Sequence, residues 1–293
     1  MAFVAGYPLS EVFLSAAIQR RGGLLRQAVE LTEALIISIP FSFIIVTGCS
    51  LLQYRNGEIL SGVTIEVRGK DQAGQLSMTK ILAAQLRYWQ EAFVRNPDIF
   101  GTLPSNPART AAEIFKNENK TAILELGGGQ GRDTVFLARN GFRVTVLDYS
   151  ESAVGAIADK ARKLSLTSYI TVCQQDVRAG LPFADESMDG CYSHMLYCMA
   201  LTTPELEFLS REVKRVLRPN GLHIYTVRHI KDPHHGKWIH LGEDLYEVGG
   251  FIVHFFSRAM VDHLAEGFEI VSIDELEEGE LPRKLFLVTL RKR

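Results

Sequence analysis

Four glycines, at positions 127, 128, 129 and 131, directly follow a short apolar run, Ala122–Leu126. The run has the composition of a strand that is buried on both faces of a parallel sheet, and residues 133–138 have the pattern of a helix start. Glycines between a strand and a helix let the backbone approach a ligand, because a Cβ atom would block both the turn and the approach. The stretch therefore predicts a loop that binds a ligand through its backbone.

A second apolar strand, Arg143–Asp148, ends on an acid 21 residues after Gly127. At this distance a nucleotide-binding α/β unit places a carboxylate on ribose hydroxyls. An aspartate at the end of a strand can also be simply solvated. The glycine loop in front of it favours the ribose role for Asp148.

The spacing of the glycines separates two classes of ligand. A dinucleotide site has the pattern G-x-G-x-x-G, and counting from Gly127 its last glycine would fall on Arg132. The chain has E-x-G-x-G-x-G instead, formed by Glu125, Gly127, Gly129 and Gly131. In this pattern the sequence resembles the class I S-adenosylmethionine-dependent methyltransferases of the small-molecule type, over about residues 77–293.

The resemblance implies S-adenosyl-L-methionine as the cofactor, together with a set of residues that bind it. A third strand, residues 170–176, ends on Asp176, and in the resembled family this acid and the residue after it face the adenine. Asp176 could instead be a simple helix cap, and both roles stay open. The residues expected to bind the cofactor are Glu125, Gly127, Gly129, Gly131, Asp148, Tyr149, Asp176, Val177 and Ser193.

Catalytic residues are expected after the fourth strand, residues 188–194, because ligands of an open α/β sheet bind beyond the carboxyl ends of its strands. S-adenosylmethionine is an activated sulfonium electrophile, so the protein must orient the acceptor, exclude water and sometimes remove a proton. His194 is the candidate base, since imidazole titrates near neutrality. Packing and hydrogen bonding are its alternative role. Tyr192 and Tyr197 are expected to orient the acceptor or to shield the sulfonium.

Strands and helices alternate along most of the chain, which predicts an α/β fold with a mostly parallel sheet and helices on both faces. The expected class is Rossmann-like, with seven strands and a final antiparallel strand, Leu285–Leu290, that the resemblance implies. The turn Leu217–Gly221 also matches the Leu-Arg-Pro-x-Gly turn of the family. A predicted helix, Met78–Arg95, carries Tyr88-Trp89. In the resembled family such a helix folds over the cofactor, and docking onto the core is the alternative.

Residues 1–76 do not share this pattern and are predicted to form a small α+β extension of unknown role, before a methyltransferase domain over 77–293. Helices are expected over 10–21 and 24–37, and strands over 41–47 and 63–67. Asn56-Gly57 predicts a hairpin. A membrane anchor is the alternative, because Ala34–Leu52 carries no charge over 19 residues. Met78 could also be a second start.

Composition limits the classes of partner. The 293 residues carry a net charge of −2, with 46% hydrophobic and 23% charged residues, so no basic field for nucleic acid is present. The acidic or Asn residue followed by Pro-Pro-Tyr or Phe that is usual in nucleic-acid amino methyltransferases is also absent after the fourth strand. The four cysteines include no C-x-x-C pair, which favours a reducing cytoplasm. We expect a small-molecule acceptor and no membrane partner, and the oligomeric state stays open.

Several alternatives remain open at this stage. The histidines at 229, 234, 235, 240 and 254 fit no metal motif, so we expect no metal and a lid-like insertion that shapes the acceptor pocket. A nicotinamide-dependent oxidoreductase on a similar sheet and a cofactor-binding module without catalysis are the other functions considered. Metalloid methylation is a subclass that would use clustered thiolates, for which Cys173, Cys191 and Cys198 are the candidates.

Overall fold

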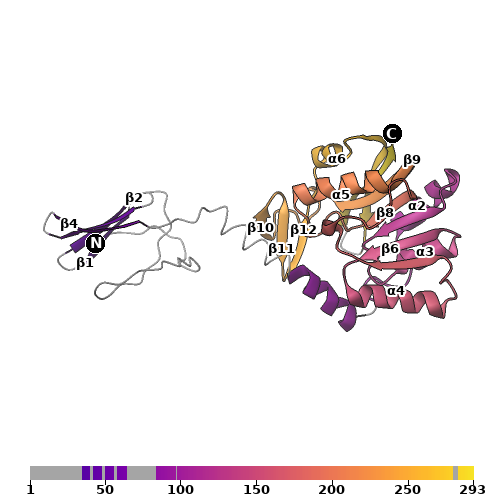
Figure 1. Cartoon of the computed structure of the whole chain (residues 1–293), viewed down its shortest axis with the longest axis horizontal. Coiled ribbons are helices and arrows are strands. Elements are labelled where there is room, and N and C mark those ends of the chain that lie inside the picture. The colour runs from indigo at the N-terminus through magenta and orange to yellow at the C-terminus, as the bar shows by residue number, and fades with distance from the viewer. Residues whose placement is uncertain are drawn as a thin grey trace. The chain divides into compact units, whose positions relative to one another are not determined.

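The computed structural model describes residues 35–39, 42–47, 50–55, 58–64, 84–96, 98–279 and 283–293. The chain divides into two compact units, Met1–Ser77 and Met78–Arg293 (Figure 1). The division lies one residue beyond the boundary expected from the sequence.

The described part of the N-terminal unit is a four-stranded antiparallel sheet, with its strands in sequence order: β1 (Leu35–Ile39), β2 (Ser42–Thr47), β3 (Ser50–Arg55) and β4 (Glu58–Thr64). The expected helix over 24–37 is wrong for residues 35–37, which lie in β1, because this stretch is rich in β-branched isoleucine. Strands β3 and β4 pair across Asn56-Gly57, where the sequence predicts a hairpin. The expected helix over 10–21, the rest of 24–37 and residues 65–67 lie outside the described residues.

The uncharged run Ala34–Leu52 is formed, where it is described, by β1, β2 and the first residues of β3. Among the residues that the structure describes, no helix is both long enough and apolar enough to cross a membrane.

The C-terminal unit contains a seven-stranded sheet with the order β13-β14-β9-β8-β5-β6-β7. Strands β9, β8, β5, β6 and β7 pair in parallel, and β14 pairs antiparallel with both β9 and β13. The predicted fold class is confirmed, and the final antiparallel strand is longer than expected. The strands are β5 (Ala122–Leu126), β6 (Arg143–Asp148), β7 (Ile170–Gln174), β8 (Met188–His194), β9 (Leu217–Arg228), β13 (Phe268–Glu278) and β14 (Arg283–Lys292).

Helices cover both faces of this sheet (Figure 1). One face carries α2 (Asn106–Asn117), α3 (Arg132–Arg139) and α4 (Glu151–Lys163), and the other carries α5 (Thr203–Val216) and α6 (Arg258–Leu264). Because side chains alternate along a strand, Ile123 of β5 packs under α2 and α3, while its neighbour Leu124 packs under α5. Burial on both faces explains why β5 has a continuous apolar sequence.

Helices α4 and α5 begin at residues that cap their first turn. The Oγ atom of Ser150 accepts from the N–H of Ala153 at 3.3 Å, and Thr202 and Glu205 form a capping box at the start of α5. The helices therefore start directly after the loops that leave β6 and β8. These loops, the glycine loop after β5 and the segment after β9 all meet at the carboxyl edge of the sheet.

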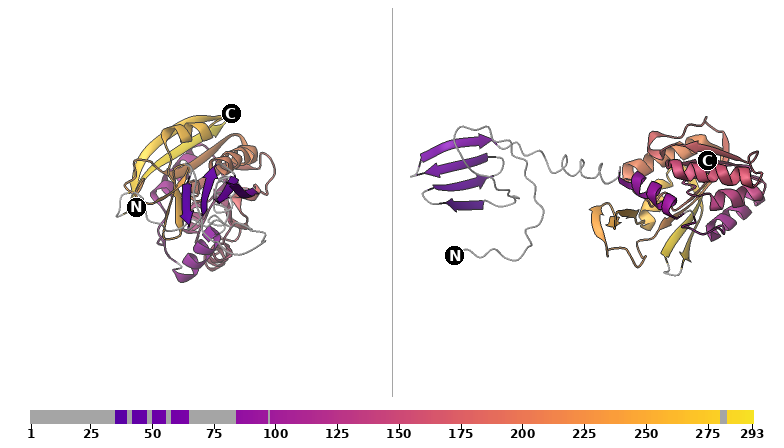
Figure 2. Two further views of the ribbon diagram at one scale, coloured as in Figure 1. Left: turned by 90° about the vertical axis from the view of Figure 1, so that its left-hand side faces the viewer. Right: turned by 90° about the horizontal axis from the view of Figure 1, so that it is seen from below.

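An insertion between β9 and α6 forms a three-stranded antiparallel sheet from β10 (Ile239–Gly242), β11 (Leu245–Val248) and β12 (Phe251–His254). Figures 1 and 2 show this small sheet beside helix 84–95. The side-chain amide of Gln85 joins the two, because it donates to the carbonyl oxygen of Gly250 and accepts from the N–H of Ile252 at 3.3 Å.

Candidate active site

The glycine loop has a backbone that only glycine adopts readily. Gly127, Gly129 and Gly131 have φ angles of 72°, 53° and 80°, in the left-handed region. Gly128 is needed for a different reason, since a Cβ atom there would lie 2.3 Å from Cγ2 of Val146. The sequence therefore places bare backbone and the start of α3 at the carboxyl end of β5, as a backbone-binding loop requires.

The carboxylate of Asp148 fastens this loop to the end of β6. Its Oδ2 atom accepts from the N–H of Gly129 and its Oδ1 atom accepts from the N–H of Ser150, both at 2.9 Å. Burial raises the pKa of Asp148 to about 6, although the N–H groups of Ser150, Gly129 and Tyr149 lower it. A carboxylate has about four lone-pair sites, so these N–H groups leave capacity to accept from a hydroxyl of a ligand.

Three buried polar atoms beside the loop have no hydrogen-bond partner in the described part of the chain: Oε2 of Glu125, Oγ1 of Thr134 and Oγ of Ser193. Burial raises the pKa of Glu125 to about 8, and the negative charge of Asp133 adds to this effect. Buried polar atoms are nearly always paired in folded proteins. An unpaired buried atom can accept a contact from a bound ligand, and the cofactor contacts of Glu125 and Ser193 stay predictions.

At the end of β7, Asp176 has the geometry of a cap. Its carboxylate accepts from the backbone N–H of Arg178 at 3.0 Å and from Nη2 of Arg178 at 2.6 Å, at the start of the short 3₁₀ helix Val177–Ala179. Burial would raise the pKa of Asp176, but the bonds from Arg178 lower it overall. Burial also raises the pKa of Tyr149. The adenine contacts of Tyr149, Asp176 and Val177 stay predictions.

At the end of β8, His194 lies between two acceptors. Its Nδ1 atom is 2.8 Å from Oγ1 of Thr226, and its Nε2 atom is 3.4 Å from Oε2 of Glu278. The His194 and Glu278 side chains are 11% and 19% exposed, so a small molecule could still approach them. The next residue, Met195, has φ of 70°, which is uncommon for a residue other than glycine, and its N–H donates to Oγ1 of Thr226 at 3.1 Å.

The structure buries both tyrosines that the sequence nominates for catalysis. The hydroxyl of Tyr192 donates to Oδ2 of Asp133 at 3.1 Å and lies 3.1 Å from Oγ of Ser105, under α2 and α3. The ring of Tyr197 stacks on Tyr225 on the opposite face, with ring centroids 4.8 Å apart. Neither residue has any exposed surface. Contact of an acceptor with the Tyr192 hydroxyl would therefore require α2 and α3 to move, and contact with the Tyr197 hydroxyl would require the loop after β8 to open.

Helix 84–95 covers the glycine loop, where the resemblance implies a covering helix. Phe93 is buried, and its Cζ atom would lie 3.6 Å from a Cβ atom built on Gly129. Trp89 meets the ring of Phe251 on β12, with centroids 5.4 Å apart. The helix therefore contacts both the loop and the insertion, and it shields this edge of the sheet from water.

The insertion is anchored by a buried ion pair between Arg228 and Asp232, whose side chains are 4% and 0% exposed. Two hydrogen bonds join them: Nη2 to Oδ1 at 2.6 Å and Nε to Oδ2 at 2.9 Å.

The histidines of this region do not converge. Within the described ranges, no group of three or more His, Cys, Asp or Glu residues is arranged to hold a metal ion.

The cysteines do not form a reactive cluster. Cys191 and Cys198 are buried, and burial raises the pKa of both thiols, that of Cys198 to about 11. Burial also raises the pKa of Cys173. Capture of a metalloid requires thiolates, so the geometry gives no support to metalloid methylation.

Solved structures define the class of this fold. A SAM-dependent methyltransferase of Methanosarcina mazei is 22% identical over 61% of this chain and 96% of its own, with a TM-score of 0.51. A protein of Pyrococcus horikoshii OT3 is 21% identical over 69% and 99%, with a TM-score of 0.53. The 1,6-didemethyltoxoflavin-N1-methyltransferase of Burkholderia thailandensis, solved with 1,6-didemethyltoxoflavin and S-adenosylhomocysteine, is 16% identical over 89% and 99%, with a TM-score of 0.54.

The family match agrees with the fold. The family described as a methyltransferase domain matches residues 123–221, which run from β5 into β9. The comparison with curated proteins gives no match. The C-terminal unit therefore has the fold of class I S-adenosylmethionine-dependent methyltransferases, and its residues 123–221 match a methyltransferase domain. The resemblance predicted from the sequence is confirmed, and the predicted cofactor class agrees with it.

Some residues of the site are not predicted by the sequence. Glu278 reaches His194 from the distant strand β13, and Asp133 accepts hydrogen bonds from Tyr192 and from Ser105. The one available signal is the position of Asp133 in the first turn of the helix after the glycines, where acids are favoured. No motif marks Glu278, because its place depends on the pairing of β13 with β14.

Proposed function

We propose that this chain transfers the methyl group of S-adenosylmethionine to a small-molecule acceptor. The observation that carries the proposal is the E-x-G-x-G-x-G loop, which has three left-handed glycines and is fastened to Asp148 through the N–H of Gly129. This arrangement lies at the carboxyl edge of a sheet of the methyltransferase class. The charge balance and the absence of a nucleic-acid signature favour a small acceptor.

The residues around the loop have the chemistry that such a cofactor requires. The glycine backbone leaves room for the methionine part, and the free lone pairs of Asp148 suit ribose hydroxyls. Oε2 of Glu125 and Oγ of Ser193 are unpaired among the described residues and can each take a polar contact. Tyr149, Asp176 and Val177 are assigned to the adenine. When bound, S-adenosylmethionine supplies a methyl group that is activated by the sulfonium.

His194 is assigned the proton-accepting role. A protonated imidazole donates from both nitrogens, and His194 has an acceptor at each of them, Thr226 at Nδ1 and Glu278 at Nε2. The two contacts fix the orientation of the ring at the end of β8. Glu278 is assigned a positioning role, because its carboxylate compensates the charge of the imidazolium. Helix 84–95 excludes water while the acceptor is held.

The test is release of S-adenosylhomocysteine by the full-length protein, incubated with S-adenosylmethionine and fractions of a small-metabolite extract. We expect at least one fraction to raise the release above the rate without acceptor. His194→Ala should lower this turnover about 10²- to 10⁴-fold without changing cofactor affinity. Cofactor binding with no stimulation by any fraction would favour the alternative, a cofactor-binding module without catalysis.

We further propose a cytoplasmic protein whose N-terminal unit is separable from catalysis. The absence of a C-x-x-C pair and the free cysteines at 173, 191 and 198 support a reducing compartment. A chain that starts at Met78 should bind S-adenosylmethionine as the full chain does. Loss of binding on truncation would assign residues 1–77 to the site.

A further inference from the structure

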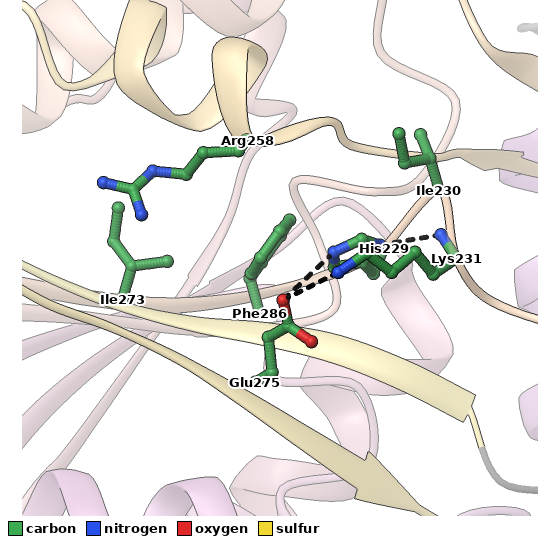
Figure 3. Close-up of a pocket in the computed structure, with 7 residues that line it drawn as sticks. All are labelled: His229, Ile230, Lys231, Arg258, Ile273, Glu275 and Phe286. Atoms are coloured by element: carbon green, nitrogen blue, oxygen red, sulfur yellow. Dashed lines mark hydrogen bonds and ion pairs between the residues drawn. The ribbon is translucent and has the colours of Figure 1, made fainter.

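A cavity of about 220 Å³ lies on the α6 side of the sheet, and its lining residues come from β13, β14, α6 and the segment after β9. None of these residues belongs to the glycine-loop site. We propose that this cavity binds a small organic monocarboxylate with an apolar body about the size of one ring. The lining consists of His229, Ile230, Lys231, Arg258, Ile273, Glu275 and Phe286 (Figure 3).

Arg258 supplies the group that recognises the anion. Its Nε atom donates to Oδ1 of Asp262 at 2.9 Å within α6. Its two Nη groups make no hydrogen bond to any residue in the described part of the chain, and Figure 3 shows the guanidinium beside Ile273. A guanidinium presents parallel N–H donors that match the two oxygens of a carboxylate. The Nη groups are therefore available for a bidentate contact.

The opposite end of the cavity is already neutralised. Oε1 of Glu275 lies 3.2 Å from Nζ of Lys231 and 3.5 Å from Nε2 of His229. The Nδ1 atom of His229 accepts from the N–H of Lys231 at 2.7 Å, so the hydrogen of its neutral ring is on Nε2, toward Glu275. One cation and one anion cancel here. The cavity therefore offers no unpaired carboxylate for an amine and, apart from the Nη groups of Arg258, no free cationic donor for a second carboxylate.

Apolar side chains form the space between the two ends. Phe286 is buried against His229, with ring centroids 4.1 Å apart, and Figure 3 shows Phe286 and Ile273 between Arg258 and Glu275. A volume of about 220 Å³ exceeds the cavity of roughly 150 Å³ that holds benzene in an engineered protein. One ring can therefore lie on Phe286 and Ile273 with a carboxylate at Arg258, and benzoate has this shape.

The experiment is a titration of the full-length protein with benzoate, followed by NMR of isotope-labelled isoleucine methyl groups. We expect saturable shifts at Ile273, with a dissociation constant at or below roughly 1 mM. Benzamide, which lacks the charge, and benzylamine, which reverses it, should bind at least about tenfold more weakly. Arg258→Gln should weaken benzoate binding by a similar factor.

The matched control is Arg162→Gln, since Arg162 is an exposed arginine that is paired with Asp159 on α4 and does not line the cavity. This control should bind benzoate as the wild type does. The proposal is overturned if Ile273 does not respond, if benzamide binds as well as benzoate, or if Arg258→Gln has no effect in a folded protein. It is also overturned if S-adenosylmethionine displaces benzoate competitively, because the anion would then occupy the glycine-loop site.

Discussion

Oε2 of Glu278 lies 3.4 Å from Nε2 of His194, although β14 and β9 separate their strands in the sheet. Glu278 reaches this place because β13 is long, and it ends at the carboxyl edge of the sheet beside the end of β8. The contact joins the β13–β14 hairpin to His194, the residue directly after Ser193. The surroundings of His194 therefore depend on a segment near the C-terminus.

The first prediction concerns the ionisation of Glu278. Burial acts to raise the pKa of this carboxyl, but the hydrogen bond and charge of His194, with the charges of Arg132 and Arg283, lower it overall. His194→Gln removes the charge of His194, so Glu278 should titrate at a higher pH in the variant. Carbon-13 NMR of the labelled carboxyl measures this. The same titration in both proteins would show that the contact does not form in solution.

The second prediction concerns Glu125 and the pH dependence of stability. The folded protein keeps a proton on Glu125 up to about pH 8, whereas the ordinary pKa is 4.5. Between these two pH values the folded state holds a proton on Glu125 that the unfolded state has lost. The stabilisation that Glu125 gives to the folded state is therefore fully present below pH 4.5 and is lost as pH rises through 8. In Glu125→Gln the free energy of unfolding, measured by urea denaturation, should fall less steeply as the pH rises. If the free energy of unfolding depends on pH in the same way in the two proteins, Glu125 does not hold a proton in the folded state.

The third prediction concerns the ion pair at the base of the insertion. Arg228→Met leaves the Asp232 carboxylate buried and uncompensated, which should cost about 3–5 kcal/mol of unfolding free energy. The double variant with Asp232→Leu should recover part of this loss. Arg162→Met, in the exposed pair with Asp159, is the control and should cost about 1 kcal/mol or less. Equal losses at the two sites would mean that the pair at Arg228 is accessible to water.

The fourth prediction separates structural from catalytic roles for Tyr192. Tyr192→Phe removes a buried hydrogen bond to the Asp133 carboxylate, so it should lower the unfolding free energy by about 1.5–3 kcal/mol. Affinity for S-adenosylmethionine and turnover per folded molecule should be retained. The opposite result, unchanged stability with lost turnover, would give Tyr192 the acceptor role that the sequence suggests.

Much of the sheet could be predicted because its strands are buried on both faces. The bounds of β5, β6 and β8 agree with the sequence prediction. β5 and β6 are mostly apolar, and β5 is followed by glycine while β6 ends on Asp148. The N-terminal unit was harder to predict because Leu24–Ile37 combines a helical spacing with a β-branched end. The isoleucines at 36, 37 and 39 favour a strand, and these residues form β1.

The glycine loop could be predicted, but the side-chain partners in the site could not. The spacing from Gly127 to Asp148 is local, whereas the contact of His194 with Glu278 depends on three strand pairings that no sequence pattern specifies. Tyr192 lies in the predicted fourth strand and Tyr197 follows it, yet which face each ring takes depends on packing. Tyr192 is held under α2 and α3 by Asp133, and Tyr197 stacks on the other face.

The most direct measurement is calorimetric titration of the full-length protein with S-adenosylmethionine and, separately, with NADH. We expect one S-adenosylmethionine site per chain and no comparable binding of NADH. Asp148→Asn keeps the shape of the side chain but removes its charge, so affinity should fall roughly ten- to hundredfold, or about 1.5–3 kcal/mol. Failure of the wild type to bind S-adenosylmethionine, or tight binding of NADH in its place, would contradict the assignment.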